Sequence, residues 1–179
     1  FSMTHIFVGI DCGVTGGVTA LDQDGLLIKL ARFDKKNPVE VMRSFFSELM
    51  ADASVEEISV ALEAVNSRSG QSVTSMFNFG VSYGKLQGFL EAFKLPYALY
   101  YPQTWQKWLP KASGPKDRVK AWALPKFTPD PFIFSGCRVP HQGCLDAAGI
   151  AEYHRAVTVG SLVRPKPVRP VKRRQAVRF

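Results

Sequence analysis

The sequence has few cysteines and no long apolar segment. Its three cysteines, Cys12, Cys137 and Cys144, are odd in number and lack CxxC spacing. This pattern argues against a disulfide framework and a zinc site, and it favours a reducing compartment. No run approaches the ~20 apolar residues of a membrane helix, so we expect no membrane partner. We interpret Cys12 as a small buried apolar residue and not as a reactive thiol.

Acidic residues are absent from the C-terminal end. The chain through His154 carries as many acidic as basic side chains, whereas Arg155 to Arg178 contributes eight basic residues and no acid. We expect a cloning remnant at residues 1–3 ahead of a truncated start, one domain over residues 4–156, and a basic, proline-containing tail over residues 157–179. Such a tail suits a polyanion such as nucleic acid, and a merely solvated tail is the alternative.

Apolar periodicity predicts a mixed α/β domain. The predicted strands lie in a hairpin over residues 6–21 and over residues 26–30, 58–62 and 96–101. The predicted helices span residues 38–49, 72–93, 103–109, 117–124 and 143–156, with a basic loop over 111–120 and an irregular loop over 128–139. Three meander strands followed by a strand-helix-strand unit predict a ribonuclease H-like fold, a five-stranded mixed sheet with helices on both faces.

Three glycines are spaced four residues apart in the long predicted helix. Gly80, Gly84 and Gly88 share one face. Each glycine costs ~1 kcal/mol relative to alanine in a helix interior. We therefore expect a close neighbour against this face, which is the sheet, another helix or a partner chain.

Three acids lie where carboxylates could gather. Asp11 ends the first strand, Glu63 ends the fourth, and Asp146 lies near the start of the last helix. Asp11 alone has two interpretations, a turn residue beside glycine or a metal ligand. In this topology the first and fourth strands are neighbours, so clustered carboxylates would repel one another without a divalent cation. Hard oxygen ligands favour Mg²⁺ or Mn²⁺, and two such ions can promote phosphodiester hydrolysis.

Several segments, in this order, resemble the RuvC class of Holliday junction resolvases. They are IFVGIDCGVTGGVTAL, VALEAV, the glycine-striped helix, the Pro-Gln-x-Trp segment, SGPKDRVKAWA and HQGCLDAAGIAEYH, and together they span most of residues 6–156. The resemblance implies a homodimeric endonuclease that nicks four-way DNA junctions symmetrically and has no small-molecule substrate. It also implies two Mg²⁺ ions per site, with Mn²⁺ as an alternative, held by Asp11, Glu63 and Asp146.

One acid of the bacterial pattern is missing. That pattern places an acid three residues before the last one, where this chain has Gly143. His141 is the natural substitute, since an imidazole can ligate the metal site, orient a water or act as a general base. A histidine that only caps the last helix is the alternative. The histidine most resembles the plant chloroplast resolvases of the monokaryotic-chloroplast type, which implies a chloroplast protein that acts in plastid DNA segregation.

Basic and polar residues near these acids are candidate DNA contacts. By the resemblance, Lys116 and Lys120 hold phosphates of the cleaved strand, and the loop after Glu63 offers side chains suited to base edges. The candidate DNA-binding residues are Arg68, Ser69, Gly70, Gln71, Lys85, Lys111, Lys116 and Lys120. A solvated surface position is the alternative for each. Trp105 and Trp108 are predicted to pack in the core.

Two other functions stay open at this point. A nucleic-acid-binding protein whose site has decayed would account for the missing acid and for the neutral charge of the domain. An actin-like or sugar-kinase ATPase also begins with a DxG hairpin, but it needs a second phosphate loop and a longer chain.

Overall fold

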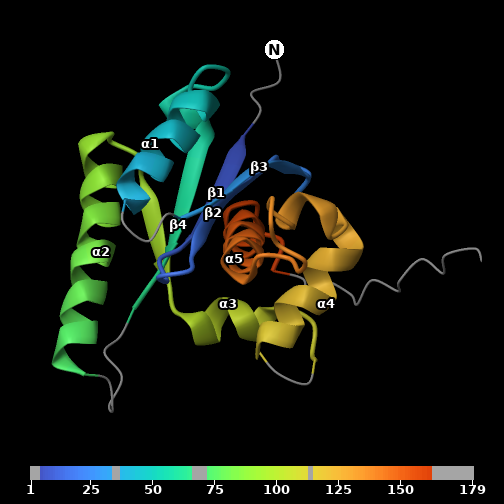
Figure 1. Ribbon diagram of the computed structural model, residues 1–179. Helices are drawn as coiled ribbons and strands as arrows, with labels where there is room; N and C mark the ends of the chain where they lie inside the picture. Colours follow the sequence, from blue (N-terminus) through green and yellow to red (C-terminus); the bar gives the residue numbers. More distant parts are fainter. Residues whose placement is uncertain (1–4, 34–36, 66–71, 113–114, 163–179) are drawn as a thin grey trace, which may run out of the picture.

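The computed structural model of the protein describes residues 5–33, 37–65, 72–112 and 115–162, and it contains a five-stranded sheet. The strands are β1 (Ile6–Asp11), β2 (Gly17–Leu21), β3 (Leu27–Arg32), β4 (Ile58–Glu63) and β5 (Tyr97–Tyr100), in the order β3-β2-β1-β4-β5. The first three form an antiparallel meander, and β4 runs parallel to both β1 and β5. The predicted mixed sheet is confirmed (Figure 1).

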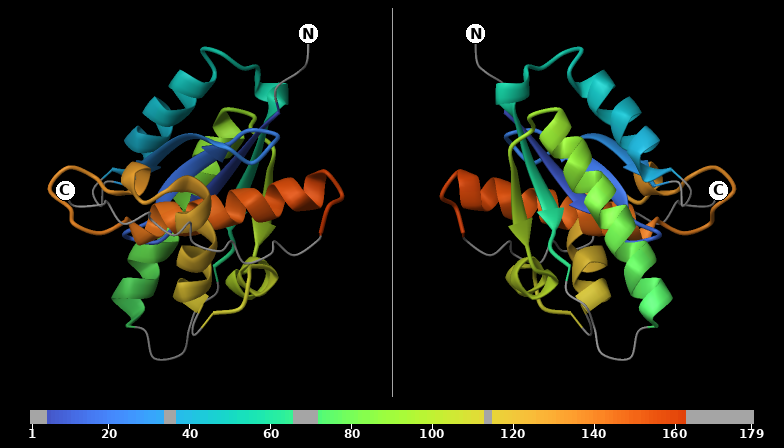
Figure 2. Two further views of the ribbon diagram at one scale, coloured as in Figure 1. Left: turned by 90° about the vertical axis from the view of Figure 1, so that its right-hand side faces the viewer. Right: turned by 90° about the vertical axis from the view of Figure 1, so that its left-hand side faces the viewer.

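Helices cover both faces of the sheet, as predicted (Figures 1 and 2). One face carries α1 (Pro38–Leu49) and α2 (Val73–Ala92), and the other carries α3 (Pro102–Trp108), α4 (Pro115–Phe127) and α5 (Gln142–Thr158). Two short 3-10 turns, η1 (Val55–Glu57) and η2 (Asp130–Phe132), lie between these elements. Among the described residues, no helix combines the length and apolar character that a membrane crossing requires.

Some element ends differ from the sequence prediction. Strand β3 begins one residue later and ends two residues later than predicted, and α5 continues to Thr158. Helix α4 begins at Pro115, ahead of the predicted start at Asp117, because proline is well suited to the first turn of a helix. It also passes Pro125 and ends at Phe127, whose ring packs against Trp122 and Phe132. Tertiary packing here outweighs the helix-breaking tendency of proline.

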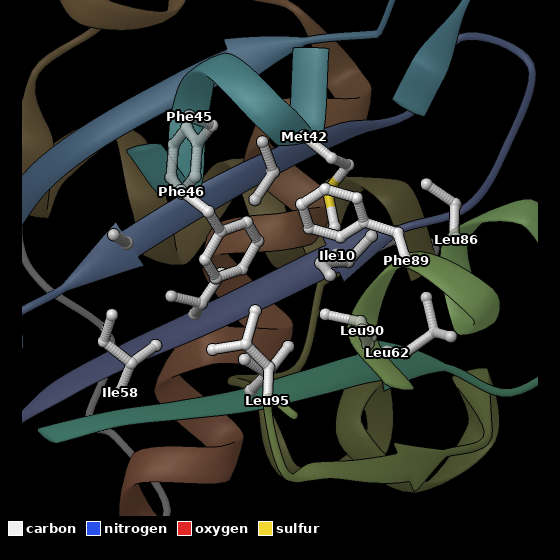
Figure 3. Packing of buried hydrophobic residues seen from close by; sticks show 14 of the residues in the cluster. Ile10, Met42, Phe45, Phe46, Ile58, Leu62, Leu86, Phe89, Leu90 and Leu95 are labelled. Atoms are coloured by element: carbon white, nitrogen blue, oxygen red, sulfur yellow. The ribbon is translucent and has the colours of Figure 1, made fainter. Parts of the chain in front are cut away.

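Alternation along the strands sorts side chains between two cores. Ile6, Val8 and Ile10 of β1 face α1 and α2, where they meet the apolar side chains shown in Figure 3. Leu21 and Ala61 belong to the second core, which Trp105, Trp108 and the buried residues of α4 and α5 complete. The prediction that both tryptophans pack in the core is therefore confirmed.

Helix α5 lies very close to the centre of the sheet. A Cβ atom on Gly9 would come within 2.0 Å of the backbone oxygen of Ala147 and within 2.5 Å of the Ala151 nitrogen. Only glycine allows this approach, since any side chain at position 9 would push the helix away. The contact holds the second and third turns of α5 against the middle of β1.

A buried histidine fastens the other end of α5. His154 Nε2 lies 2.7 Å from the Ser59 hydroxyl, and Nδ1 lies 2.9 Å from the Tyr100 hydroxyl. Burial, with a smaller contribution from His5, lowers the pKa of His154 to about 4. The ring is therefore neutral near pH 7, and it links α5 to β4 and β5.

The glycine stripe of α2 faces away from the rest of the described chain. A Cβ atom on Gly80, Gly84 or Gly88 would meet nothing within 4 Å in the part of the protein that the structure describes. Neither the sheet nor another described helix is therefore the close neighbour expected from the sequence. Val73, Phe77 and Val81 are exposed on the same side of the helix.

Candidate active site

The carboxylates of Asp11 and Glu63 meet at the ends of two neighbouring parallel strands. Ile10 pairs with Leu62, so Asp11 and Glu63, which follow them, end their strands side by side at the same end of the sheet. Ile10 and Leu62 point toward α1 and α2, and alternation turns the two acids to the face of α5. Ligand atoms of Asp11, Cys12 and Glu63 lie within 4.8 Å of one another. The sequence prediction that these two acids come together agrees with this placement.

Asp11 has the turn role considered for it from the sequence, in a setting that would also suit a metal ligand. Its Oδ1 accepts a hydrogen bond from the Gly13 N–H at 3.0 Å, which is the usual chemistry of an aspartate before a glycine turn. Burial nevertheless raises the pKa of this carboxyl, and the Gly13 hydrogen bond offsets only part of that effect. The turn therefore orients the carboxylate, and its negative charge is poorly stabilised without a cation.

Glu63 is oriented by a core tryptophan. Trp105 is fully buried, and its Nε1–H donates to Glu63 Oε1 at 3.2 Å. An indole held rigidly in the core fixes one oxygen of the carboxylate, which restricts the directions in which the other can point. The residue predicted only as core packing therefore also supports the candidate site.

We expect Trp105→Phe to weaken divalent-metal binding about tenfold or more, because Glu63 loses the donor that orients it. Isothermal titration with Mn²⁺ measures this change. Trp108→Phe is the matched control, since Trp108 is a buried residue of the same helix whose Nε1–H donates to the Leu162 oxygen and not to Glu63. Equal metal affinity in the two variants would contradict a positioning role for Trp105.

Cys12 borders the acids but is a poor ligand for a hard cation. The thiol is buried, and its Sγ lies 3.6 Å from the Glu63 backbone oxygen, to which it donates. Burial, with smaller contributions from Asp11 and Glu63, raises the pKa of Cys12. The protonated thiol agrees with the sequence interpretation of a small buried apolar residue. A cavity of about 40 Å³ lies beside it, lined in part by Gly13, Ser82 and Leu86.

The first turn of α5 is placed against the loop that follows Asp11. Gly16 and Gly143 form a parallel bridge, and a Cβ on Gly143 would lie 2.2 Å from the Thr15 oxygen. This contact brings Asp146 to the same end of the sheet, although it is not part of the group within 4.8 Å. Asp146 Oδ1 accepts from Gln142 Nε2 at 2.9 Å. Gly143, where the bacterial pattern has an acid, therefore meets a close backbone contact.

His141 caps α5. Its Nδ1 accepts from the Cys144 backbone N–H at 3.3 Å, and the backbone N–H of His141 donates to the Phe132 backbone oxygen at 2.8 Å. Burial, with a smaller contribution from Arg32, lowers the pKa of His141. In the neutral ring that this hydrogen bond implies, Nε2 carries the proton and is a donor. A metal bond or base role at Nε2 would require the ring to give up the cap.

Arg32 is a cation near His141 that the sequence reasoning missed. Its guanidinium lies 5.0 Å from the centre of the Phe134 ring, and the Phe134 and His141 rings meet edge to face at 5.5 Å. Arg32 is exposed at the end of β3, where the chain gave no signal beyond a basic residue after an apolar strand. Only the tertiary contact between β3 and the loop before α5 reveals it.

The candidate DNA-binding residues are only partly described. Lys85 is exposed on α2, Lys120 is exposed on α4, and Lys111 is exposed between α3 and α4. The backbone of Lys116 lies in the first turn of α4, and its side chain is outside the described part. The residues of the loop after Glu63 also lie outside the described residues: Arg68, Ser69, Gly70 and Gln71.

The donor set fits a hard divalent cation. Ligand oxygens of Asp11 and Glu63 lie within 4.8 Å of each other, and burial disfavours the negative charge of Asp11. Asp146 lies at the same end of the sheet on α5. Oxygen ligands of this kind suit Mg²⁺ or Mn²⁺, and a bound cation removes the repulsion among them. Asp11, Glu63 and Asp146 are the residues that could hold it.

The fold is that of two solved structures of RuvC from Thermus thermophilus. RuvC in complex with a Holliday junction substrate superimposes with a TM-score of 0.59 at 16% sequence identity, covering 87% of this chain and 97% of that chain. A structure of Thermus thermophilus RuvC gives a TM-score of 0.52 with the same identity and coverage. These likenesses establish the ribonuclease H-like fold predicted from the sequence. No protein-family model and no curated protein sequence matches the chain.

Proposed function

We propose that this protein is a metal-dependent endonuclease that resolves four-way DNA junctions. The observation that carries the proposal is the meeting of Asp11 and Glu63 at the ends of β1 and β4, beside the first turn of α5 with Asp146. The same fold in RuvC, which has been solved with a Holliday junction substrate, supports this substrate class.

The roles of the residues follow from their chemistry. Asp11, Glu63 and Asp146 hold two Mg²⁺ ions, with Mn²⁺ as an alternative. When bound, such ions activate a water and stabilise the leaving oxygen of a phosphodiester. His141, neutral at pH 7, donates from Nε2 to a phosphate oxygen while its Nδ1 caps α5. Lys85, Lys111, Lys116 and Lys120 bind backbone phosphates, and Arg68, Ser69, Gly70 and Gln71 contact bases at the crossover.

Binding and cleavage of a synthetic four-way junction, measured in the same samples, test the proposal. We expect the junction to be bound in Mg²⁺ and in EDTA and to be cut only in Mg²⁺ or Mn²⁺, with a linear duplex of the same sequence left intact. Binding without cutting in both metals would favour the decayed binding protein instead. Equal cutting of junction and duplex would contradict the structure selectivity.

Two substitutions separate the catalytic role of His141 from its role as a helix cap. His141→Ala removes both roles, whereas His141→Asn keeps a side chain that caps helices well. We expect both variants to cut junctions about a hundredfold more slowly than wild type, with only His141→Ala showing a lower melting temperature. A wild-type cleavage rate in His141→Asn would show that the histidine is only a cap.

We place the homodimer contact on the exposed face of α2. Gly80, Gly84 and Gly88 allow a backbone to come close, and Val73 and Phe77, 79% and 70% exposed, offer apolar contacts. In a two-fold symmetric dimer, this face of α2 packs against the same face of a second copy. The two active sites would then be directed at opposed strands of a junction.

Phe77→Glu is expected to shift the dimer toward monomer, raising the dimer dissociation constant about thirtyfold or more. Sedimentation velocity over a concentration series measures this constant. Leu26→Glu is the control, because Leu26 is 61% exposed in the turn between β2 and β3. A dimer unaffected by Phe77→Glu would remove α2 from the interface.

The chloroplast location and the role in plastid DNA segregation are also proposals, which rest on the histidine pattern at His141. Helix α5 extends to Thr158, so it includes the first two residues of the tail predicted over residues 157–179. In this proposal the rest of the basic tail adds salt-dependent, sequence-independent affinity for DNA.

A further inference from the structure

Gln142 has one half of its side-chain amide engaged and the other half without a partner. Its Nε2 donates to Asp146 Oδ1 at 2.9 Å, one helical turn further along α5. Its Oε1 is buried and accepts no hydrogen bond from any described residue. A buried acceptor left unsatisfied is unfavourable, so in native proteins such an oxygen usually binds a water or an ion.

The orientation of the amide is fixed by the charge of Asp146. Exchanging the nitrogen and oxygen of Gln142 would place two oxygens 2.9 Å apart, one of them on a carboxylate that carries a negative charge when ionised. The nitrogen therefore stays on Asp146, and Oε1 is directed elsewhere. Oε1 is not a surface oxygen that bulk water reaches freely, since its atom is buried.

The backbone places Gln142 beside the candidate active site. Gly143, the next residue, forms a bridge with Gly16, and a Cβ on Gly16 would lie 2.0 Å from the backbone oxygen of Asp11. Gln142 thus lies between the loop that follows Asp11 and the carboxylate of Asp146. Amide oxygens are hard, neutral donors that bind divalent cations together with carboxylates.

We propose that Gln142 Oε1 is a further oxygen donor of the metal site, bound to the cation or to a water of its coordination shell. This inference rests on the proposed metal-dependent function and names a residue of that same site. Through its two ends, Gln142 both orients Asp146 and adds a neutral donor beside the carboxylates.

Two substitutions of Gln142 give opposite results if its oxygen serves the cation. Gln142→Leu removes both ends of the amide, and we expect Mn²⁺ binding to weaken about tenfold. Gln142→Glu keeps an oxygen and adds a charge, and we expect Mn²⁺ to bind at least as tightly as in wild type. In EDTA, Gln142→Glu should melt at a lower temperature than wild type because the new carboxylate repels Asp146, and Mn²⁺ should restore it.

Isothermal titration of the full chain with Mn²⁺, together with melting curves in Mn²⁺ and EDTA, measures these effects without DNA. Gln23→Glu is the control for added charge, since Gln23 is exposed in the turn between β2 and β3. Weaker Mn²⁺ binding in Gln142→Glu than in wild type would show that Gln142 acts only as a donor to Asp146. Wild-type affinity in Gln142→Leu would also overturn the proposal.

The same titrations separate this inference from the proposed function. If Asp11→Asn binds Mn²⁺ as wild type does and the wild-type protein leaves junctions uncut, the metal-dependent function itself fails. If Asp11→Asn loses Mn²⁺ binding and the wild-type protein cuts junctions, the metal-dependent function holds. If both Gln142 variants then bind Mn²⁺ as wild type does, only the role of Gln142 is wrong. The Gln142→Glu arm stands by itself if Gln142→Leu does not fold.

Discussion

Replacing Asp11 with asparagine is expected to leave junction binding intact and to slow cleavage by about a hundred- to a thousandfold. Asparagine keeps an oxygen that accepts the Gly13 N–H, so the turn after β1 should be preserved. It removes the charge that holds the cation. Rate measurements under single-turnover conditions, paired with binding in EDTA, report the two effects separately.

Asp11→Asn should also melt at the wild-type temperature or slightly above it when no metal is present. Burial raises the pKa of Asp11, which means that the folded protein stabilises the ionised carboxylate less well than water does. Asp24→Asn, an exposed change in the turn between β2 and β3, is the matched control for both measurements. Cleavage by Asp11→Asn at the wild-type rate would contradict the site assignment.

The second large effect is expected at an ion cluster around the buried side chain of Glu152 on α5. Glu152 is 5% exposed, and its carboxylate receives two hydrogen bonds of 2.9 Å from Arg155 and lies 3.3 Å from Lys126 Nζ. Arg155 also donates to the backbone oxygen of Gln23 at 3.0 Å. The cluster therefore joins α5 to α4 and to the turn between β2 and β3.

Glu152→Ala is expected to lower the free energy of unfolding by about 3 kcal/mol, because it leaves two partly buried cations together without their shared carboxylate. Both cations keep some contact with water, which favours the lower end of the range for a broken buried pair. Urea denaturation measures the change. Glu40→Ala breaks an exposed pair with Arg43 and should cause little change. Similar stabilities for both variants would contradict a structural role for the cluster.

The sheet and the pairing of Asp11 with Glu63 could be predicted because each depends on local patterns. A glycine hairpin, alternating strands and a strand-helix-strand unit determine which strands are neighbours. Once β1 and β4 are parallel neighbours, an acid at the end of each strand must come close to the other. The position of Asp146 near the start of a helix was similarly local.

The support around these acids could not be predicted, because it depends on side chains that are distant in sequence. Nothing in the sequence links Trp105 to Glu63, and the contact requires α3 to cross the end of β4. The two ends of Gln142 differ only through the packing of α5 against the loop after Asp11. The glycine stripe predicts a close neighbour, and the part of the chain that the structure describes supplies none.

Mapping of cleavage positions on all four strands of a synthetic junction tests the central claim most directly. With the full chain and Mg²⁺, we predict paired nicks at symmetric positions in two opposed strands. DNA ligase should seal these nicks because they carry 5′-phosphate and 3′-hydroxyl ends, and EDTA should prevent them. A junction that is bound but stays uncut in Mg²⁺ and in Mn²⁺ would contradict the account.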